Sequence, residues 1–211
     1  MSKVEKLNTE LKIQYEHNNT LESFTKYVMS EICYPIEDYI NFVNLIKINC
    51  YKHISCELLI IGTHLAIQWT DSDYNELLTM LNSMMPILPN KEKSIVHYLN
   101  AYKLYFRNKK DYLTNPRYVG ELKNSTELDT SFVNNYHLLA ECSTGKDALY
   151  FYSYALNNVK EVFSSDESSI ESMSLDDLLN PQRYIDEFIL GTVMSKCCYN
   201  SMKKKCNFNE Y

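Results

Sequence analysis

Apolar residues recur every three or four positions along most of this chain, which is the spacing of one face of an α-helix. A first helix is predicted over residues 21–30, and a second begins after Pro35. Further helices are predicted over residues 54–69, 74–85, 94–107, 111–122, 131–142, 148–163 and 183–202. No stretch alternates convincingly between apolar and polar positions, as a half-buried strand would. The pattern therefore predicts an all-α fold, a compact bundle of about seven to eight helices on which the last, C-terminal helix packs.

Residues 54–69, ISCELLIIGTHLAIQW, form the most apolar of the predicted helices. Apolar side chains fill nearly all sides of this helix, which predicts that it lies at the centre and is surrounded by others. Gly62 stands in its middle, although a glycine costs about 1 kcal/mol in a helix relative to alanine. Close packing of a neighbouring helix would explain a residue without a side chain at this position.

Breaks in the pattern indicate how the chain is organised. Pro86 follows one predicted helix, and Pro116 interrupts the pattern over residues 111–122, so that only a short helix with an irregular start is expected there. A serine-rich, acidic stretch, SSDESSIESMSLDD, has the composition of a linker. Three parts are predicted: a helical bundle domain over 1–163, an acidic serine-rich linker over 164–180, and a C-terminal helix with a basic tail over 181–211, packed on the bundle.

Composition agrees with a helical, acidic protein. The chain of 211 residues has only four glycines and five prolines, which is little turn material for a β-protein. Its net charge is −6, whereas binding to a phosphate backbone requires a positive surface. Arginine, the residue suited to bidentate recognition of phosphates and bases, occurs only at Arg107, Arg117 and Arg183. Nucleic acid is therefore not an expected partner.

Cysteine usage and hydropathy predict the compartment. Seven cysteines without a recognisable signal peptide indicate free thiols in a reducing environment. No apolar run approaches the roughly 20 residues needed to cross a bilayer. The expectation is a soluble, cytoplasmic protein with no membrane anchor.

The strongest candidate metal set is Cys50, His53, Cys56 and His64. On a helix, however, Cys50 and Cys56 would point about 120° apart, and the chain has no C-x-x-C knuckle. Packing cysteines and hydrogen-bonded histidines explain these residues without a metal. The glycine-rich phosphate loops and the G-x-S-x-G nucleophile motif are also missing from the sequence. The prediction is a protein that is not an enzyme and binds no cofactor.

The residues around Gly62 carry a resemblance to a known family. The pattern Ile54-x3-Leu58-x2-Ile61-Gly62-Thr63-x-Leu65 resembles a degenerate third Bcl homology motif, with Thr63 in place of the usual aspartate. The flanking segments IEDYINF (36–42), AI (66–67) and NELL (75–78) are similar to the N-terminal half of the poxvirus Bcl-like immunomodulatory proteins. The resemblance covers about residues 35–85.

This resemblance implies a non-enzymatic viral protein. Such proteins bind host signalling or apoptotic proteins in the cytoplasm and inhibit innate immune signalling (NF-κB or interferon) or apoptosis. Association of two copies of the chain into a homodimer is also compatible with this resemblance. The candidate protein-binding residues are Tyr39, Phe42, Val43, Trp69 and Tyr74, of which exposed members would act as anchors for a partner. Packing in the core is the alternative interpretation of the same residues.

An alternative interpretation of the fold is a short tetratricopeptide-like α-solenoid. The segment ALYFYSYAL (148–156) resembles the second helix of such a repeat, and Ala148, Tyr152 and Ala155 match its small, aromatic, small spacing. Helix pairs would then recur at irregular intervals of about forty residues. The resemblance to such repeats implies a regulatory protein with a concave, tyrosine-lined site that binds a peptide.

Overall fold

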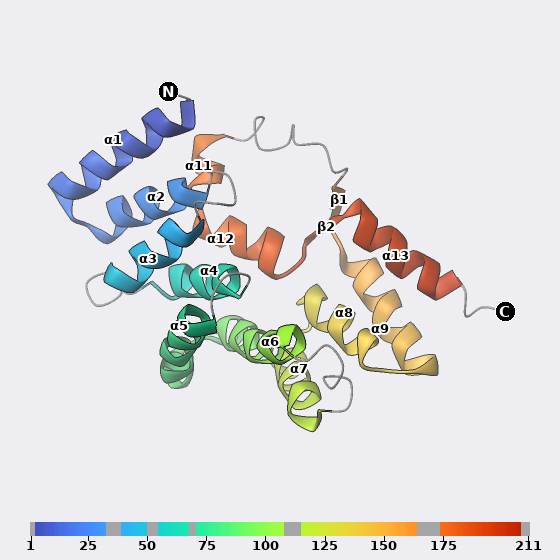
Figure 1. Cartoon of the computed structure of the whole chain (residues 1–211). Helices are drawn as coiled ribbons and strands as arrows, with labels where there is room; N and C mark the ends of the chain where they lie inside the picture. Colours follow the sequence, from blue (N-terminus) through green and yellow to red (C-terminus); the bar gives the residue numbers. More distant parts are fainter. Residues whose placement is uncertain are drawn as a thin grey trace. The chain divides into compact units, whose positions relative to one another are not determined.

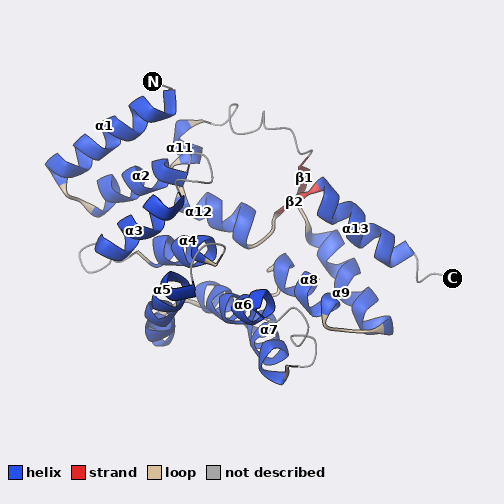
Figure 2. Cartoon of the chain, in the orientation of Figure 1, coloured by secondary structure: helices blue, strands red, loops and turns tan. Residues whose placement is uncertain are grey.

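A computed structural model of the chain describes residues 3–32, 39–49, 55–67, 71–107, 115–163 and 174–207. Over these ranges it forms twelve α-helices, two short helical turns of other types, and two strands of three residues each (Figures 1 and 2). The prediction of an all-α fold is confirmed at this level, but the number of helices exceeds the predicted seven to eight. The two strands were not predicted, because three residues are too few to establish an alternating pattern.

The contacts of the chain divide it into two compact units. Unit 1 comprises Met1–Leu81 and Glu167–Ile185, and unit 2 comprises Asn82–Asp166 and Asp186–Tyr211. The predicted parts 1–163, 164–180 and 181–211 follow different boundaries, because residues 174–185 belong to unit 1 and residues 186–207 to unit 2. Residues 164–173 of the predicted linker lie outside the described residues.

Unit 1 is built around α4. Its helices are α1 (Lys3–Asn18), α2 (Leu21–Ile32), α3 (Tyr39–Asn49), α4 (Cys56–Ala66), most of α5 (Asp71–Met84), α11 (Leu175–Leu178) and α12 (Pro181–Tyr184). Ser55 caps α4 by accepting a hydrogen bond from the Leu58 amide, and eight of the eleven residues of α4 are buried. Helices α3 and α12 both pack against it. The prediction that this apolar helix is a buried one is confirmed.

Gly62 lies where two other helices approach α4. A Cβ atom at this position would lie 3.0 Å from Cδ1 of Ile46 on α3 and 3.4 Å from Cδ1 of Leu77 on α5. Both side chains are buried. Close packing of neighbouring helices therefore explains the glycine, as predicted.

Unit 2 consists of helical hairpins followed by a C-terminal helix. Its elements are η2 (Met85–Ile87), α6 (Asn90–Arg107), α7 (Pro116–Leu128), α8 (Val133–Glu141), α9 (Gly145–Asn158), β1 (Glu161–Phe163), most of the π-helical turn η4 (Ile185–Ile189), β2 (Val193–Ser195) and α13 (Lys196–Asn207). Helix α6 packs on α7, α7 on α8, and α8 on α9. Strands β1 and β2 pair in parallel, with Val162 opposite Met194, and α13 returns to pack on α9 (Figure 1).

Three helices also differ from the sequence prediction. Helix α1 was not predicted, although Leu7, Leu11 and Tyr15 have helical spacing and Leu11 is buried. Pro116 does not interrupt α7 but is its first residue, because proline has no amide hydrogen to lose in a first turn. The predicted helix over 183–202 is broken, and Gly191 adopts a φ of +67° between η4 and β2.

Candidate functional site

The predicted protein-binding residues lie mainly in the core of unit 1. Phe42, Val43 and Tyr74 expose 0%, 3% and 1% of their surface. Tyr39 is the first residue of α3, but its side chain is not among those described, and Trp69 lies outside the described residues. Burial of the three favours the packing interpretation, and a role of the five residues in binding a partner stays a prediction.

The opposite face of α3 presents apolar side chains to solvent. Ile40 and Ile48 are 48% and 74% exposed, and the exposed Asn44 lies between them on the same side of the helix. Phe42 and Val43, the described residues predicted on α3, lie on its buried face. An isoleucine pair on an exposed helix face provides apolar contact area for another protein.

The candidate metal set is not brought together on α4. Cys56 and His64 stand eight residues apart on this helix, which separates their backbones by about 12 Å. That distance exceeds what these two side chains can span to one zinc ion. Cys50 and His53 lie outside the described residues. Burial lowers the pKa of His64 to about 4, so its imidazole is neutral at pH 7.

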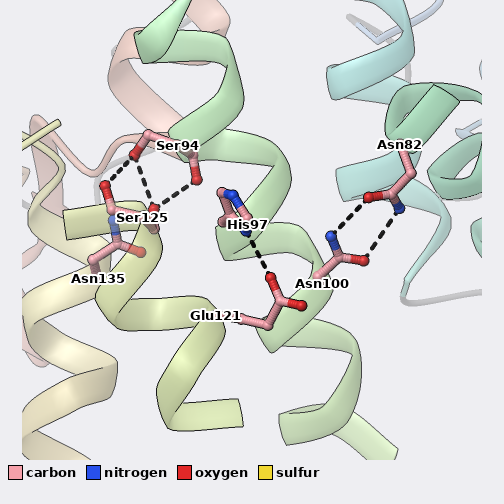
Figure 3. Close-up of polar contacts among 7 residues, drawn as sticks. All are labelled: Asn82, Ser94, His97, Asn100, Glu121, Ser125 and Asn135. Carbon is pink, nitrogen blue, oxygen red and sulfur yellow. Dashed lines mark hydrogen bonds and ion pairs between the residues drawn. The ribbon is translucent and has the colours of Figure 1, made fainter. Parts of the chain in front are cut away.

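Unit 2 contains a buried polar layer that joins three helices (Figure 3). Ser94 of α6, Ser125 of α7 and Asn135 of α8 are each fully buried. The Ser125 hydroxyl donates to the Ser94 carbonyl at 2.6 Å and accepts from the Asn135 amide at 2.6 Å. The Ser94 hydroxyl lies 2.9 Å from the Ser125 carbonyl and 2.8 Å from its hydroxyl. These bonds fix the register of α6, α7 and α8.

A histidine and a carboxylate lie next to this layer. Nδ1 of His97, on α6, is 2.7 Å from Oε2 of Glu121, on α7. The two side chains are 20% and 19% exposed. One helical turn further along α6, the amides of Asn100 and Asn82 exchange two hydrogen bonds of 3.1 and 3.2 Å (Figure 3).

The chemistry of the His97 and Glu121 pair depends on what a third group contributes. A carboxylate on Nδ1 orients an imidazole so that Nε2 can accept a proton or bind a metal. The nearest serine in sequence, Ser94, is one turn away but is already bonded to Ser125. On the contacts described, the pair joins α6 to α7 and does not form a nucleophile with its base.

Apart from the polar layer, unit 2 contains a cluster of charged side chains that connects α8, α9 and α13. Nζ of Lys205 lies 2.5 Å from Oε1 of Glu141 and 2.9 Å from the hydroxyl of Tyr152. The Tyr152 hydroxyl also donates to Glu141, and Lys205 lies 5.0 Å from the centre of the Tyr152 ring. Oε1 of Glu141 is 3.9 Å from Nε2 of His137.

The pKa values in this cluster indicate a stable ion pair. Burial alone would raise the pKa of Glu141, but the hydrogen bonds from Lys205 and Tyr152 outweigh it and lower the pKa. Burial would likewise lower the pKa of Lys205, but its bonds to Glu141 and Tyr152 raise it. Burial and the bond to Glu141 raise the pKa of Tyr152 to about 12. A lysine that stays protonated holds α13 in place and is not a nucleophile.

Sequence reasoning missed both polar clusters of unit 2. A signal was present for the first, because Ser94, His97 and Asn100 recur at intervals of three residues on one face of α6. Glu121 and Ser125 form the matching stripe on α7. The second cluster had no comparable signal, since Glu141 and Lys205 are 64 residues apart in the sequence.

Comparison with known proteins gives no family for this chain. No protein-family model, no curated protein and no solved structure matches it. Among the described helices, none is long and apolar enough to cross a membrane. In the same ranges, no group of three or more histidine, cysteine, aspartate or glutamate side chains is arranged to hold a metal ion.

Proposed function

We propose that the protein is a non-enzymatic viral protein that binds host signalling or apoptotic proteins in the host cytoplasm. By this binding it inhibits innate immune (NF-κB or interferon) or apoptotic signalling, as the resemblance to the poxvirus Bcl-like proteins implies. The contact surface is the exposed face of α3, with Ile40 and Ile48 as its apolar residues.

The packing around Gly62 is the observation that supports this proposal. The resemblance rests on a small residue in an apolar helix that lets its neighbours approach closely. In unit 1, Ile46 of α3 and Leu77 of α5 approach Gly62 in this way. Helix α3 packs against α2 and α4, with Phe42 and Val43 buried and Ile40 and Ile48 on the solvent side. An apolar surface of this kind suits the binding of a partner helix or loop.

The test uses the full chain with an affinity tag in cells that carry an NF-κB or interferon reporter. We expect the protein to lower the reporter signal and to co-purify with a signalling protein of the same pathway. The double substitution Ile40→Asp and Ile48→Asp should abolish both effects, because two charges would oppose burial of this face. Ile87→Asp is the matched control, since Ile87 is 79% exposed but belongs to unit 2. No effect of the wild-type protein on any of these pathways would refute the proposal.

A second candidate function is binding of a peptide by a tetratricopeptide-like hairpin array. It is favoured by unit 2, in which α6, α7, α8 and α9 each pack on the next helix in the chain, as in stacked repeats. Tyr152 and Ala155, which carry the resemblance to such a repeat, are 6% and 0% exposed. If unit 2 binds a peptide, the double substitution Ile40→Asp and Ile48→Asp on α3 should leave peptide binding unchanged.

A further inference from the structure

The hairpin of α8 and α9 carries a group of four aromatic rings, which we call the tyrosine face: Tyr136, Tyr150, Phe151 and Tyr154. The rings of Tyr136 and Tyr154 are stacked, with centres 4.0 Å apart. Tyr150 lies 6.3 Å from Tyr154 and 5.4 Å from Phe151. Tyr136 is buried, whereas Tyr150 is 60% exposed. The rings therefore form a surface with a fixed base and an accessible edge.

Side-chain packing holds this surface rigid. The hydroxyl of Tyr154 donates to the Thr130 carbonyl at 3.1 Å, which fixes its ring against the turn between α7 and α8. Phe151 packs on the hydrophobic core that Tyr136 shares with Tyr152 and Ala155. A rigid aromatic surface loses little conformational entropy when it binds a ligand.

Carboxylates flank the tyrosine face at both ends. Asp129 lies in the turn next to Thr130, where its side chain accepts hydrogen bonds from the amide and hydroxyl of Ser131 at 2.8 and 2.7 Å. Asp129 is the neighbour in the chain of Thr130, whose carbonyl accepts the hydrogen bond of Tyr154. Burial, the charge and hydrogen bond of Tyr154, and the charges of Tyr150 and Asp129 raise the pKa of Tyr136. At the other end the exposed Asp147 is on the same side of α9, three residues before Tyr150.

Aromatic rings and carboxylates attract the same kind of ligand. The face of a tyrosine ring carries a negative quadrupole and binds cations, and arginine is the side chain most often found there. Asp129 and Asp147 add a carboxylate at either end. Asp147 and Tyr154 are separated by about 10 Å along the helix, which equals about three residues of an extended peptide.

We propose that the tyrosine face binds an extended basic segment of another protein, with two arginines about three residues apart. One guanidinium would stack near Tyr150 beside Asp147, and the other near Tyr154 beside Asp129. The inference rests on the second candidate function, peptide binding by unit 2, and names the chemistry of the peptide.

Lys146 is a cation on the same helix that can compete with a ligand for this ring. It is exposed, and it stands four residues before Tyr150, so its ammonium group can reach the same ring. Arginine competes well at such a site because its guanidinium is planar and less strongly hydrated. Replacing Lys146 by glutamine should leave binding unchanged or strengthen it.

The test measures fluorescence anisotropy of a labelled peptide with two arginines separated by two glycines, added to the full chain at low salt. The matched peptide carries citrulline, which has the same shape without the charge, at both positions. We expect the arginine peptide to bind at least about threefold more tightly. Tyr150→Ala should weaken binding about threefold to tenfold, whereas Tyr150→Phe keeps the ring and should preserve it. Asp147→Asn should weaken binding, and the weakening should diminish as salt is added.

A control variant outside the tyrosine face completes the test. Ile87→Ala changes an exposed apolar residue elsewhere in unit 2 and should leave the affinity unchanged. Equal binding of the citrulline peptide, or full binding by a folded Tyr150→Ala variant, would overturn the inference. So would self-association that Tyr150→Ala abolishes, because the occupant would then be a second copy of the chain. None of these results bears on the proposed binding of host proteins by the exposed face of α3, which the reporter experiment tests separately.

Discussion

Two glycines lie in the interior of helices and have different surroundings. Gly62 of α4 faces Ile46 and Leu77, whereas a Cβ atom added to Gly120 of α7 would meet nothing within 4 Å. Both glycines reduce helix propensity by a similar amount. Only at Gly62 does packing compensate for this cost, because the missing side chain allows two helices to approach.

The substitution of valine for each glycine should therefore have unequal effects. In Gly62→Val, the Cβ atom would already crowd Ile46, and the two methyl groups need further space. We therefore expect a loss of about 1 to 3 kcal/mol in the free energy of unfolding. Gly120→Val is the matched control and should change it by no more than about 0.5 kcal/mol. Urea unfolding of both variants measures the difference. Equal losses at the two positions would contradict close packing at Gly62.

The candidate binding residues on α3 illustrate what helical spacing can and cannot indicate. Periodicity indicated a helix after Pro35 with several apolar positions, and α3 is that helix. It did not indicate which side faces α4, because α3 is apolar on two sides. The buried Phe42 and the exposed Ile40 are both large and apolar. Only the position of the neighbouring helices distinguishes an inner residue from an accessible one.

Breaks between elements depend on backbone conformation as much as on side chains. The segment after α12 was predicted to continue as a helix, since its apolar residues keep helical spacing. Gly191 adopts a left-handed conformation there, and the chain then forms β2 beside β1. The approach of Asn134, whose amide donates to the Ile189 carbonyl at 2.5 Å, leaves no room for a Cβ atom.

Gly191→Ala should thus be more destabilising than Gly145→Ala. Both glycines have positive φ, at +67° and +60°, and alanine in this conformation costs about 1 kcal/mol. At Gly191 the new Cβ would also lie 2.4 Å from Oδ1 of Asn134, whereas at Gly145 nothing lies within 4 Å. We expect Gly191→Ala to lose at least about 1 kcal/mol more. Thermal unfolding of the two variants gives the comparison, and a smaller loss at Gly191 would refute this account of the break.

The C-terminal segment contributes to both units of the molecule. Helix α12 packs against α4 of unit 1, and α13 packs against α9 of unit 2. Met194 and Met202, at 6% and 0% exposure, belong to the core that α8 and α9 form. Lys205 adds its ion pair with Glu141 to the same contact. Residues beyond 174 therefore complete the cores of the units that precede them.

A fragment of residues 1–163 should not retain the stability of the full chain. Its loss of α12 and α13 would expose apolar surface on α4 and α9, which costs roughly 25 cal/mol per Å². We expect a lower melting temperature and faster amide hydrogen exchange in both helices. A chain ending at residue 207 is the control and should behave as the full chain does. If the fragment matched the full chain, the predicted bundle domain over 1–163 would be supported.

The sequence by itself determined the class of fold and the position of most helices, because helical periodicity and caps are local properties. It identified the apolar helix around Gly62 and the reason for that glycine. The polar layer of Ser94, Ser125 and Asn135, and the ion pair of Glu141 with Lys205, were decided only by the tertiary structure. Each of these contacts joins residues distant in the chain, and local patterns do not encode which helices meet. The same holds for the tyrosine face, since four spaced aromatic residues form one surface only after α8 and α9 pair.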